Sequence, residues 1–299
     1  MEKVAIIIVN YKNEDLTIRF IKEQLVKIAF PYSVIIVNNT ASDASDNKLS
    51  KTLNAPVVYD VNSYNYREED SCFVIHENEN CGFAKANNTG SIFARYHLNS
   101  DYLLFSNNDI EIIDKDIITQ LIKCLEKNSE IGLIGPKVIG PDGRLQSPEP
   151  YYSFFDLMVR PYFSILKTKN TNNCSYSVNA KEGFHYKVMG SFFLLKTCDF
   201  FQCGMMDTNT FLYFEENILS ERLRKIGKKV YYYPGVSVLH AHSQTISKYA
   251  SFKRQRNFMF NSGAYYYKTY RSINGIYISF AWLLKEFSIF VGSIRRLFS

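Results

Sequence analysis

The chain has 299 residues, of which 46% are hydrophobic and 21% charged, so it can bury a large core and is not a disordered polypeptide. Its 14 glycines and 8 prolines exclude collagen-like and low-complexity classes. The net charge of +6 is concentrated at the C-terminus, because residues 253–299 carry eight Lys and Arg against one Glu. The six cysteines form no C-x-x-C pair, and the N-terminal apolar run is too short for a signal peptide, so we expect a cytoplasmic location.

Apolar runs and helical repeats alternate through the first half of the chain. The run Val4–Val9 is typical of a buried parallel strand, and the helical spacing that follows it from Asn13 ends before Pro31. Further strands are predicted at 34–37, 57–58, 72–75, 102–105 and 131–138, and further helices at 83–98 and 117–125. This alternation predicts an α/β domain with a mainly parallel sheet.

The second half of the chain changes character after Pro141. Residues 142–185 are rich in Pro, Ser, Asn and Tyr, and this composition predicts a loop-rich segment. Beyond it we expect a strand at 188–195, a short helix at 218–226, two strands at 230–233 and 236–239 separated by a turn at Pro234-Gly235, and a long helix at 249–270.

Polar residues follow three of the predicted strands directly. They are Asn10-Tyr11, Asn38-Asn39 and Asn107-Asn108-Asp109. Ligands of open α/β sheets bind outside the carboxyl ends of the strands, so amides and a carboxylate at three such ends suit a nucleotide and a metal. Asn and Asp are also common turn residues, which is the simpler explanation of any one end. No G-x-G-x-x-G or G-x-x-x-x-G-K-[ST] motif is present, so dinucleotide-dependent dehydrogenases and P-loop enzymes are not supported.

Short motifs taken in chain order resemble the inverting family-2 glycosyltransferases, especially their rhamnosyltransferase-like branch. The motifs are Ile8-Val9-Asn10-Tyr11, Val37-Asn38-Asn39-Thr40-Ala41-Ser42-Asp43, Asn80-x-Gly82-Phe83-Ala84-x-x-Asn87-x-x-Gly90, Leu104-Phe105-Ser106-Asn107-Asn108-Asp109, Gly135-Pro136-Lys137 with Asp142-Gly143, Gly204-Met-Met-Asp207 running to Phe211-Leu-Tyr213-Phe-Glu215-Glu216, and Val238-Leu-His240. Each motif is weak alone, and their order and spacing over about residues 3–260 carry the resemblance.

The resemblance implies a GT-A fold, which has a Rossmann-like, mainly parallel sheet with flanking helices. Residues 1–260 would form the transferase domain, with a nucleotide-sugar-binding half at about 1–140 and an acceptor-binding half at about 141–260. A basic, aromatic helical extension near the membrane would occupy residues 261–299. The residues that would line the donor site are Asn10, Tyr11, Asn39, Asp43, Asn80, Gly82, Asn87, Asn107, Asn108 and Arg256.

The resemblance also implies a divalent metal on the donor diphosphate. Asp109 matches the last acid of the D-x-D element, and His240 matches a histidine that often completes the metal site. Mg²⁺ or Mn²⁺ neutralises charge that develops on phosphate oxygens, and a carboxylate with an imidazole suits Mn²⁺ somewhat better. A histidine at a strand end can instead be held by hydrogen bonds alone, and His242 is the second candidate for the ligand.

Glu215-Glu216 is the acid pair suited to general base catalysis. An acceptor hydroxyl needs a base within hydrogen-bond reach, and the family has Glu-Asp here with the second acid as the base. We therefore assign the base to Glu216 and acceptor positioning to Glu215. Two acids at the start of a helix are also favoured by the helix dipole alone.

The sequence departs from the family pattern at two places that bear on the donor. Asn38 stands where the family usually has Asp, and Asn107 replaces the first acid of D-x-D. We expect inverting transfer, with dTDP-rhamnose as the favoured donor, to a saccharide or lipid-linked acceptor in surface polysaccharide biosynthesis. The alternatives are a transferase that uses a UDP-hexose or UDP-galactofuranose, and a sugar-nucleotide-binding protein with a degenerate site.

The C-terminal segment is both basic and aromatic, which points to an anionic partner. Its uncharged stretch at 272–284 has 13 residues, too few to cross a bilayer core that needs about 20. We expect an interfacial amphipathic helix on the inner face of the cell membrane. The alternative is that its aromatic residues pack against the domain or in a homodimer. No nucleic-acid partner is expected.

Overall fold

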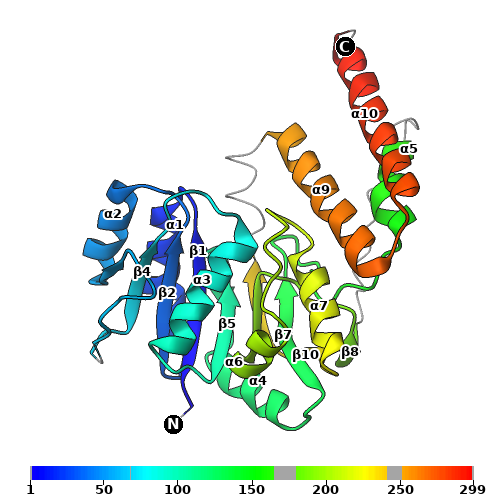
Figure 1. Cartoon of the computed structure of the whole chain (residues 1–299). Coiled ribbons are helices and arrows are strands. Elements are labelled where there is room, and N and C mark those ends of the chain that lie inside the picture. Colours follow the sequence, from blue (N-terminus) through cyan, green and yellow to red (C-terminus); the bar gives the residue numbers. More distant parts are fainter. Residues whose placement is uncertain (1, 68, 165–179, 241–250, 298–299) are drawn as a thin grey trace.

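The computed structural model describes residues 2–67, 69–164, 180–240 and 251–297. Within these residues the strands form one sheet in the order β3-β4-β2-β1-β5-β9-β7-β10-β6, with β8 paired to β10 (Figure 1). The strands are β1 (Val4–Asn10), β2 (Tyr32–Asn38), β3 (Val57–Val58), β4 (Cys72–His76), β5 (Tyr102–Ser106), β6 (Ile110–Ile112), β7 (Ile131–Ile139), β8 (Gly183–His185), β9 (Phe192–Lys196) and β10 (Lys229–His240).

Helices cover both faces of the sheet. They are α1 (Glu14–Arg19) with η1 (Phe20–Gln24) and η2 (Leu25–Lys27), α2 (Asp43–Leu53), α3 (Phe83–Tyr96), α4 (Ile117–Glu126), η3 (Phe155–Val159) with α5 (Arg160–Ser164), α6 (Thr197–Gln202), α7 (Glu215–Lys225), α9 (Phe252–Arg271) and α10 (Gly275–Leu297). Alternate residues of β1 enter opposite cores, Ile6 beside residues of α2 and α4, and Ile7 beside residues of α3 and α7. The continuous apolar runs follow from this two-sided burial.

The strands of the N-terminal half run parallel and end at one edge of the sheet. β1 pairs in parallel with β2 and β5, and β2 pairs in parallel with β4. The register places Asn10 beside Asn38, and Asn38 beside His76. The expected α/β class with a mainly parallel sheet is therefore confirmed, and the polar strand ends lie together.

The second half completes the sheet with mixed pairing. β9 lies antiparallel to both β5 and β7, whereas β10 is parallel to β7 and antiparallel to β6. The predicted turn at Pro234-Gly235 is wrong, because β10 continues through it as one strand. The register with β7 shifts between Tyr233 and Ser237, so the proline lies in an irregularity where it removes no ladder hydrogen bond.

Other predicted boundaries also differ from the structure. The first helical segment ends at Lys27 rather than near Pro31, because Ile28 has an extended backbone. The segment predicted to be loop-rich contains helical turns at 155–164 and β8, and the strand predicted at 188–195 is confined to Phe192–Lys196. Of the helix predicted at 249–270, α9 accounts for Phe252 onward, and residues 241–250 lie outside the described residues.

A separate helical layer joins the C-terminal helices to the sheet domain. Phe260, Tyr266 and Tyr267 of α9 are buried against η3, α5 and α7, together with Ala281 of α10. Figure 1 shows α10 extending away from the sheet with α5 beside it. The expected domain boundary at residue 260 falls inside α9. Among the described residues, no helix combines the length and apolarity needed to span a bilayer.

Candidate active site

The amides at the ends of β1 and β2 form a buried hydrogen-bond network. Asn10 Nδ2 donates to Asn38 Oδ1 at 2.9 Å, and Thr17 Oγ1 donates to Asn10 Oδ1 at 2.7 Å. Asn38 Nδ2 donates to Asp46 Oδ1 at 2.7 Å. Asn108, which follows β5, joins the network by donating from Nδ2 to Thr17 Oγ1 at 2.8 Å. Asn10 and Asn108, both expected to line the donor site, thus use their amides to hold the strand ends together.

A second group of the expected donor residues closes the loop before α3. Asn39 Nδ2 donates to Asn80 Oδ1 at 2.9 Å, and Asn87 Nδ2 donates to the Phe83 carbonyl at 3.0 Å. Gly82 has φ +84°, and a Cβ there would lie 2.7 Å from the Phe211 carbonyl oxygen. Only glycine suits both the positive φ and this close approach. The structure therefore brings Asn39, Asn80, Gly82 and Asn87 together beside the segment that leads to α7.

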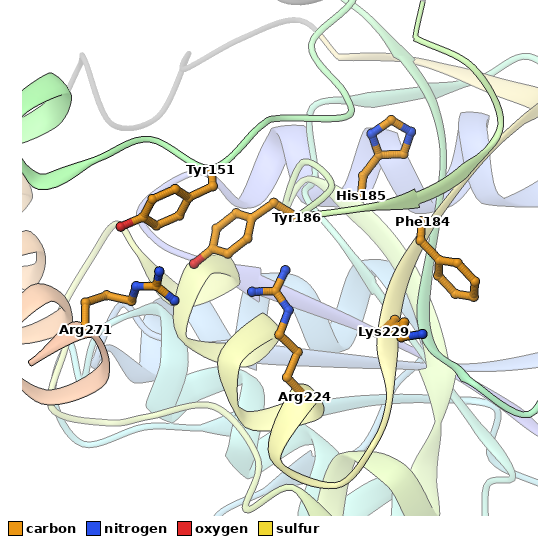
Figure 2. Close-up of a pocket in the computed structure, with 7 residues that line it drawn as sticks. All are labelled: Tyr151, Phe184, His185, Tyr186, Arg224, Lys229 and Arg271. Carbon is orange, nitrogen blue, oxygen red and sulfur yellow. The ribbon is translucent and has the colours of Figure 1, made fainter.

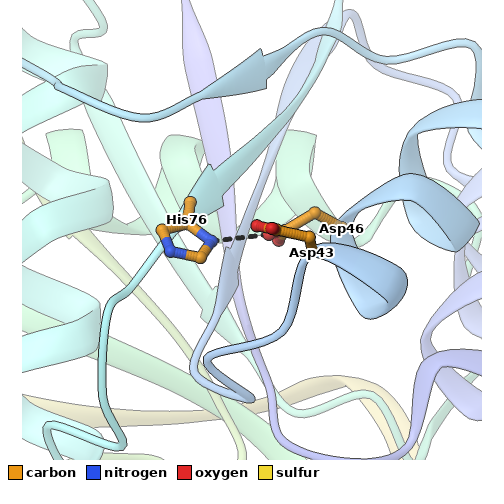
Figure 3. Close-up of side chains that lie close together, drawn as sticks. All are labelled: Asp43, Asp46 and His76. Atoms are coloured by element: carbon orange, nitrogen blue, oxygen red, sulfur yellow. Dashed lines mark hydrogen bonds and ion pairs between the residues drawn. The ribbon is translucent and has the colours of Figure 1, made fainter.

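Asp43, Asp46 and His76 meet beside the ends of β2 and β4 (Figure 3). His76 Nδ1 lies 2.5 Å from Asp46 Oδ2, and the ligand-type atoms of all three residues lie within 4.8 Å of one another. In the part of the chain that the structure describes, this is the only group of three or more acidic, His or Cys residues compact enough to hold a metal. Sequence reasoning missed His76, because only the register of β2 with β4 places it opposite Asn38.

Asp109 and His240, the two expected metal ligands, lie together at the same edge of the sheet. His240 Nε2 is 3.3 Å from Asp109 Oδ1, and the two side chains are 8% exposed or less. The pairing of β6 with β10 accounts for this contact, because His240 is the register partner of Ile110, the residue after Asp109. Asn107 Nδ2 lies 3.5 Å from His240 Nε2.

Gln146 fixes the other side of the His240 ring. Its Oε1 lies 2.7 Å from His240 Nδ1, so it accepts a proton carried on Nδ1 and leaves Nε2 on the side of Asp109 and Asn107. A metal-ligating histidine commonly has such a partner, which sets its tautomer. No feature of the sequence singled out Gln146, since it lies on a segment between β7 and η3 with no periodic pattern.

Glu215 and Glu216 begin α7 and have different surroundings. Phe214, just before the helix, has φ 71°, and this bend buries Glu215 to 4% exposure. Burial, with the adjacent Glu216 charge, raises the pKa of Glu215. Glu216 is half-buried, and its Oε1 would lie 1.7 Å from a Cβ at Gly190. The Glu216 carboxylate therefore lies against the bare backbone of Gly190.

Gly190 connects this carboxylate to the strand ends. The next residue, Ser191, accepts a hydrogen bond through its carbonyl from the Asn107 backbone N–H at 2.8 Å. Among the described residues, five buried side-chain atoms have no hydrogen-bond partner, and three of them belong to Asp109, Ser191 and Glu215, which lie on the segments described above. Unsatisfied buried polar atoms are rare, and each of these three is available to a ligand.

No contact described above involves Tyr11 or Arg256. Tyr11 is half-buried and borders the ammonium of Lys12, which lies 5.3 Å from its ring centre. Arg256 lies within the helical layer, where its guanidinium is 5.2 Å from the Tyr162 ring and within 3.5 Å of Ser288 Oγ. His242 lies outside the described residues.

Comparison with family models and with curated proteins gives no match. Solved structures do match. They include a mannosyltransferase, PcManGT of Pyrobaculum calidifontis, in complex with GDP-Man and Mn²⁺ (TM-score 0.54, 12% identity, covering 87% of this chain and 62% of that one). GalNAc-T7 with UDP, GalNAc and Mn²⁺ also matches, with a TM-score of 0.60 and 14% identity, covering 89% of this chain and 50% of that one. TarS of S. aureus matches with a TM-score of 0.52 and 12% identity, covering 90% of this chain and 44% of that one.

The chain thus spans less than two thirds of each of these proteins. At 12–14% sequence identity, the similarity shows the fold alone. The central sheet and its flanking helices agree with it, and a C-terminal helical extension is present. The protein therefore has the GT-A fold of glycosyltransferases.

Proposed function

We propose that the protein is a metal-dependent glycosyltransferase that inverts the transferred sugar. One observation supports this proposal: Asp109 lies 3.3 Å from His240 at the carboxyl edge of the sheet, and its buried Oδ1 has no hydrogen-bond partner among the described residues. Glu216 lies against Gly190, the residue before Ser191, whose carbonyl accepts a hydrogen bond from the Asn107 backbone N–H. Two of the similar structures hold a nucleotide or nucleotide sugar together with Mn²⁺. A nucleotide-diphosphate sugar and a divalent cation are the corresponding ligands here.

Asp109 and His240 are suited to hold the cation. Asp109 Oδ1 is a buried carboxylate oxygen that makes no hydrogen bond among the described residues, and His240 Nε2 lies 3.3 Å from it. A bound Mn²⁺ or Mg²⁺ would neutralise charge on the departing diphosphate. The competing group is Asp43, Asp46 and His76, but Asp46 already engages both His76 and Asn38. Metal binding there would displace those hydrogen bonds.

Glu216 is the general base in this proposal. Its carboxylate takes the proton of the acceptor hydroxyl while the acceptor oxygen forms a bond to the anomeric carbon, and the bond from that carbon to the diphosphate oxygen breaks with its electron pair. Attack opposite the leaving group inverts the anomeric carbon. Glu215, buried and with a raised pKa, holds its proton more readily and shapes the acceptor side.

The favoured donor is dTDP-rhamnose, on the family resemblance, and the acceptor a saccharide or lipid-linked oligosaccharide of a surface polysaccharide. UDP-hexoses and UDP-galactofuranose are the alternative donors. A binding protein without catalysis is the second candidate function, because Asn107 stands in place of an acid beside His240.

A donor screen tests the proposed function. Thermal unfolding is measured with dTDP-, UDP- and GDP-sugars, each with Mn²⁺, Mg²⁺ or a chelator, and release of nucleoside diphosphate is followed with the best binder. A ligand at 100 times its dissociation constant adds about 2.7 kcal/mol of stability. We expect stabilisation by one donor that needs the metal, and turnover that Glu216→Gln removes. Binding without any turnover would favour the second candidate function.

We also propose that α10 places the enzyme on a membrane surface. Five apolar residues recur along one side of the helix and are 51–75% exposed: Ile276, Phe280, Leu283, Phe287 and Phe290. The opposite side, which packs on α9 and α5, includes the buried polar residues Lys285 and Ser288. The helix thus turns its apolar side outward, and residues 253–299 carry a net charge of +7, which favours an anionic bilayer on the cytoplasmic side.

Vesicle co-sedimentation of the full chain tests the membrane proposal. Phe280→Ser with Phe287→Ser should reduce sedimentation with anionic vesicles, whereas the matched control Val26→Ser, an apolar residue 66% exposed on the sheet domain, should not. High salt should weaken binding without abolishing it, since charge contributes only part of it. If the double variant sediments normally and instead turns a dimer into a monomer, α10 is a subunit interface.

A further inference from the structure

A pocket of about 530 Å³ lies at the far end of β10 from His240. Lys229, the first residue of the strand, lines it, whereas His240 is the last of the 12 residues. Arg224 at the end of α7 and Arg271 at the end of α9 complete its cationic lining. The pocket is therefore separate from the candidate active site.

Each cation in the pocket is held against an aromatic ring (Figure 2). The guanidinium of Arg271 lies 4.5 Å from the centre of the Tyr151 ring, and that of Arg224 lies 4.5 Å from the centre of Tyr186. The Lys229 ammonium lies 5.0 Å from the centre of Phe184. These contacts restrict the cationic side chains, so less side-chain freedom remains to be lost when they bind a ligand.

The positive charge of the pocket is only partly balanced. Arg224 and Arg271 both donate to the same oxygen, Oε1 of Glu221, at 3.4 and 3.1 Å, and Lys229 pairs with Glu130 at 2.7 Å. One carboxylate compensates one guanidinium, so three cations face two carboxylates. The side chains of Arg224, Arg271 and Lys229 are 34–47% exposed and remain accessible to a ligand.

We propose that this pocket binds an acidic saccharide, through its carboxylate or phosphate group. Arginine forks bind such groups in a bidentate manner, and the volume suits a sugar-sized ligand rather than a bare ion. The Tyr151 and Phe184 residues are 40% and 41% exposed, so their rings offer apolar faces to the C–H side of a sugar. The proposed binding of an acidic saccharide rests on these contacts alone. The assignment of the saccharide as a remote part of the acceptor rests on the proposed function.

Calorimetric titration with tetragalacturonate tests the proposal, with maltotetraose as the neutral counterpart and inorganic phosphate as the bare anion. Tetragalacturonate should bind the wild type and Asp109→Asn alike, which separates this pocket from the metal site. Arg224→Gln with Arg271→Gln should weaken binding about tenfold or more, since two charge-assisted contacts are lost. The control Arg95→Gln removes a guanidinium stacked 4.3 Å from Phe201 elsewhere on the surface and should have no effect.

Arg271 joins α9 to α7 through Glu221, and Arg224 pairs with Glu221 within α7, so the double variant is checked by circular dichroism. If it does not fold, Lys229→Gln, a half-exposed position, should weaken binding in the same direction. The proposal is overturned if tetragalacturonate does not bind at millimolar concentration, if folded pocket variants bind it as tightly as wild type, or if phosphate alone binds equally well. None of these measurements depends on catalysis. A negative result would therefore overturn the binding proposal without contradicting the proposed transferase activity.

Discussion

Replacement of Gly190 by alanine should move the Glu216 carboxylate while leaving the fold intact. A Cβ at this position would lie 1.7 Å from Glu216 Oε1 and 2.6 Å from Cδ, and real Cβ atoms do not approach other atoms closer than 3.0 Å. The carboxylate must therefore withdraw by more than about 1 Å, a displacement that can cost about 10²-fold in rate when it affects a catalytic group. The obstructing group is the end of a flexible side chain, so we expect a loss of about 1 kcal/mol or less in unfolding free energy.

The assay for Gly190→Ala combines turnover, donor affinity and urea unfolding. Turnover should fall about 10²-fold, with metal-dependent donor binding and stability close to wild type. Gly275→Ala is the matched control, because a Cβ there meets nothing within 4 Å. If Gly190→Ala turns over like wild type, Glu216 does not act from the position seen in the structure, and the assignment of the base fails.

Three further predictions concern acidic residues around α7. Glu216→Gln should keep donor affinity and lower turnover by about 10²–10⁴-fold in steady-state assays, whereas Glu215→Gln should act mainly on the acceptor KM; the reverse ranking would exchange their roles. Burial and the Glu216 charge raise the pKa of Glu215 to about 8, whereas its unfolded pKa is about 4.3. The free energy of unfolding of the wild type therefore falls as pH rises between these two values. Urea unfolding of Glu215→Gln should therefore show its stability relative to wild type increasing from pH 5 to pH 8, and a constant difference would refute this. Burial tends to raise the pKa of Asp207, but hydrogen bonds from Tyr270 and Asn209 lower it to about 2. The charged Asp207 therefore stabilises the fold above its unfolded pKa, and this contribution is lost as pH falls toward 2. Asp207→Asn should cost about 2–4 kcal/mol at pH 7, because it breaks a buried contact with Arg222, and unaltered urea unfolding would contradict this role.

The fold could be predicted from local patterns where burial is uniform. Runs such as Val4–Val9 are buried on both sides and alternate with helices, and this is enough to specify a parallel sheet. The antiparallel direction of β9 between β5 and β7 could not be predicted, because an antiparallel strand buried on both faces has the same continuous apolar sequence as a parallel one. The Pro234-Gly235 pair resembled a turn because the pairing of β10 with β7 on both sides of it is a tertiary effect.

The candidate site was predictable where a residue ends a strand. Asp109 was found in this way, His240 was expected from the family resemblance, and the register of β6 with β10 brings the two together. Gln146 and His76 were missed, because the first lies in an irregular segment and the second acquires its partner Asp46 only through the fold. Arg256 was expected at the donor site from the family resemblance, and the structure places it among Tyr162 and Ser288.

Manganese binding by variants of the two acid–histidine groups tests the central claim most directly. Binding of Mn²⁺ in the presence of a nucleoside diphosphate is measured by electron paramagnetic resonance for Asp109→Asn, His240→Ala, Asp43→Asn and His76→Ala, with folding checked by circular dichroism. We expect Asp109→Asn and His240→Ala to weaken metal binding by at least about tenfold, and the other two variants to bind as wild type. Loss of binding in Asp43→Asn and His76→Ala, with Asp109→Asn and His240→Ala unaffected, would contradict the assignment and move the metal to the group at the ends of β2 and β4.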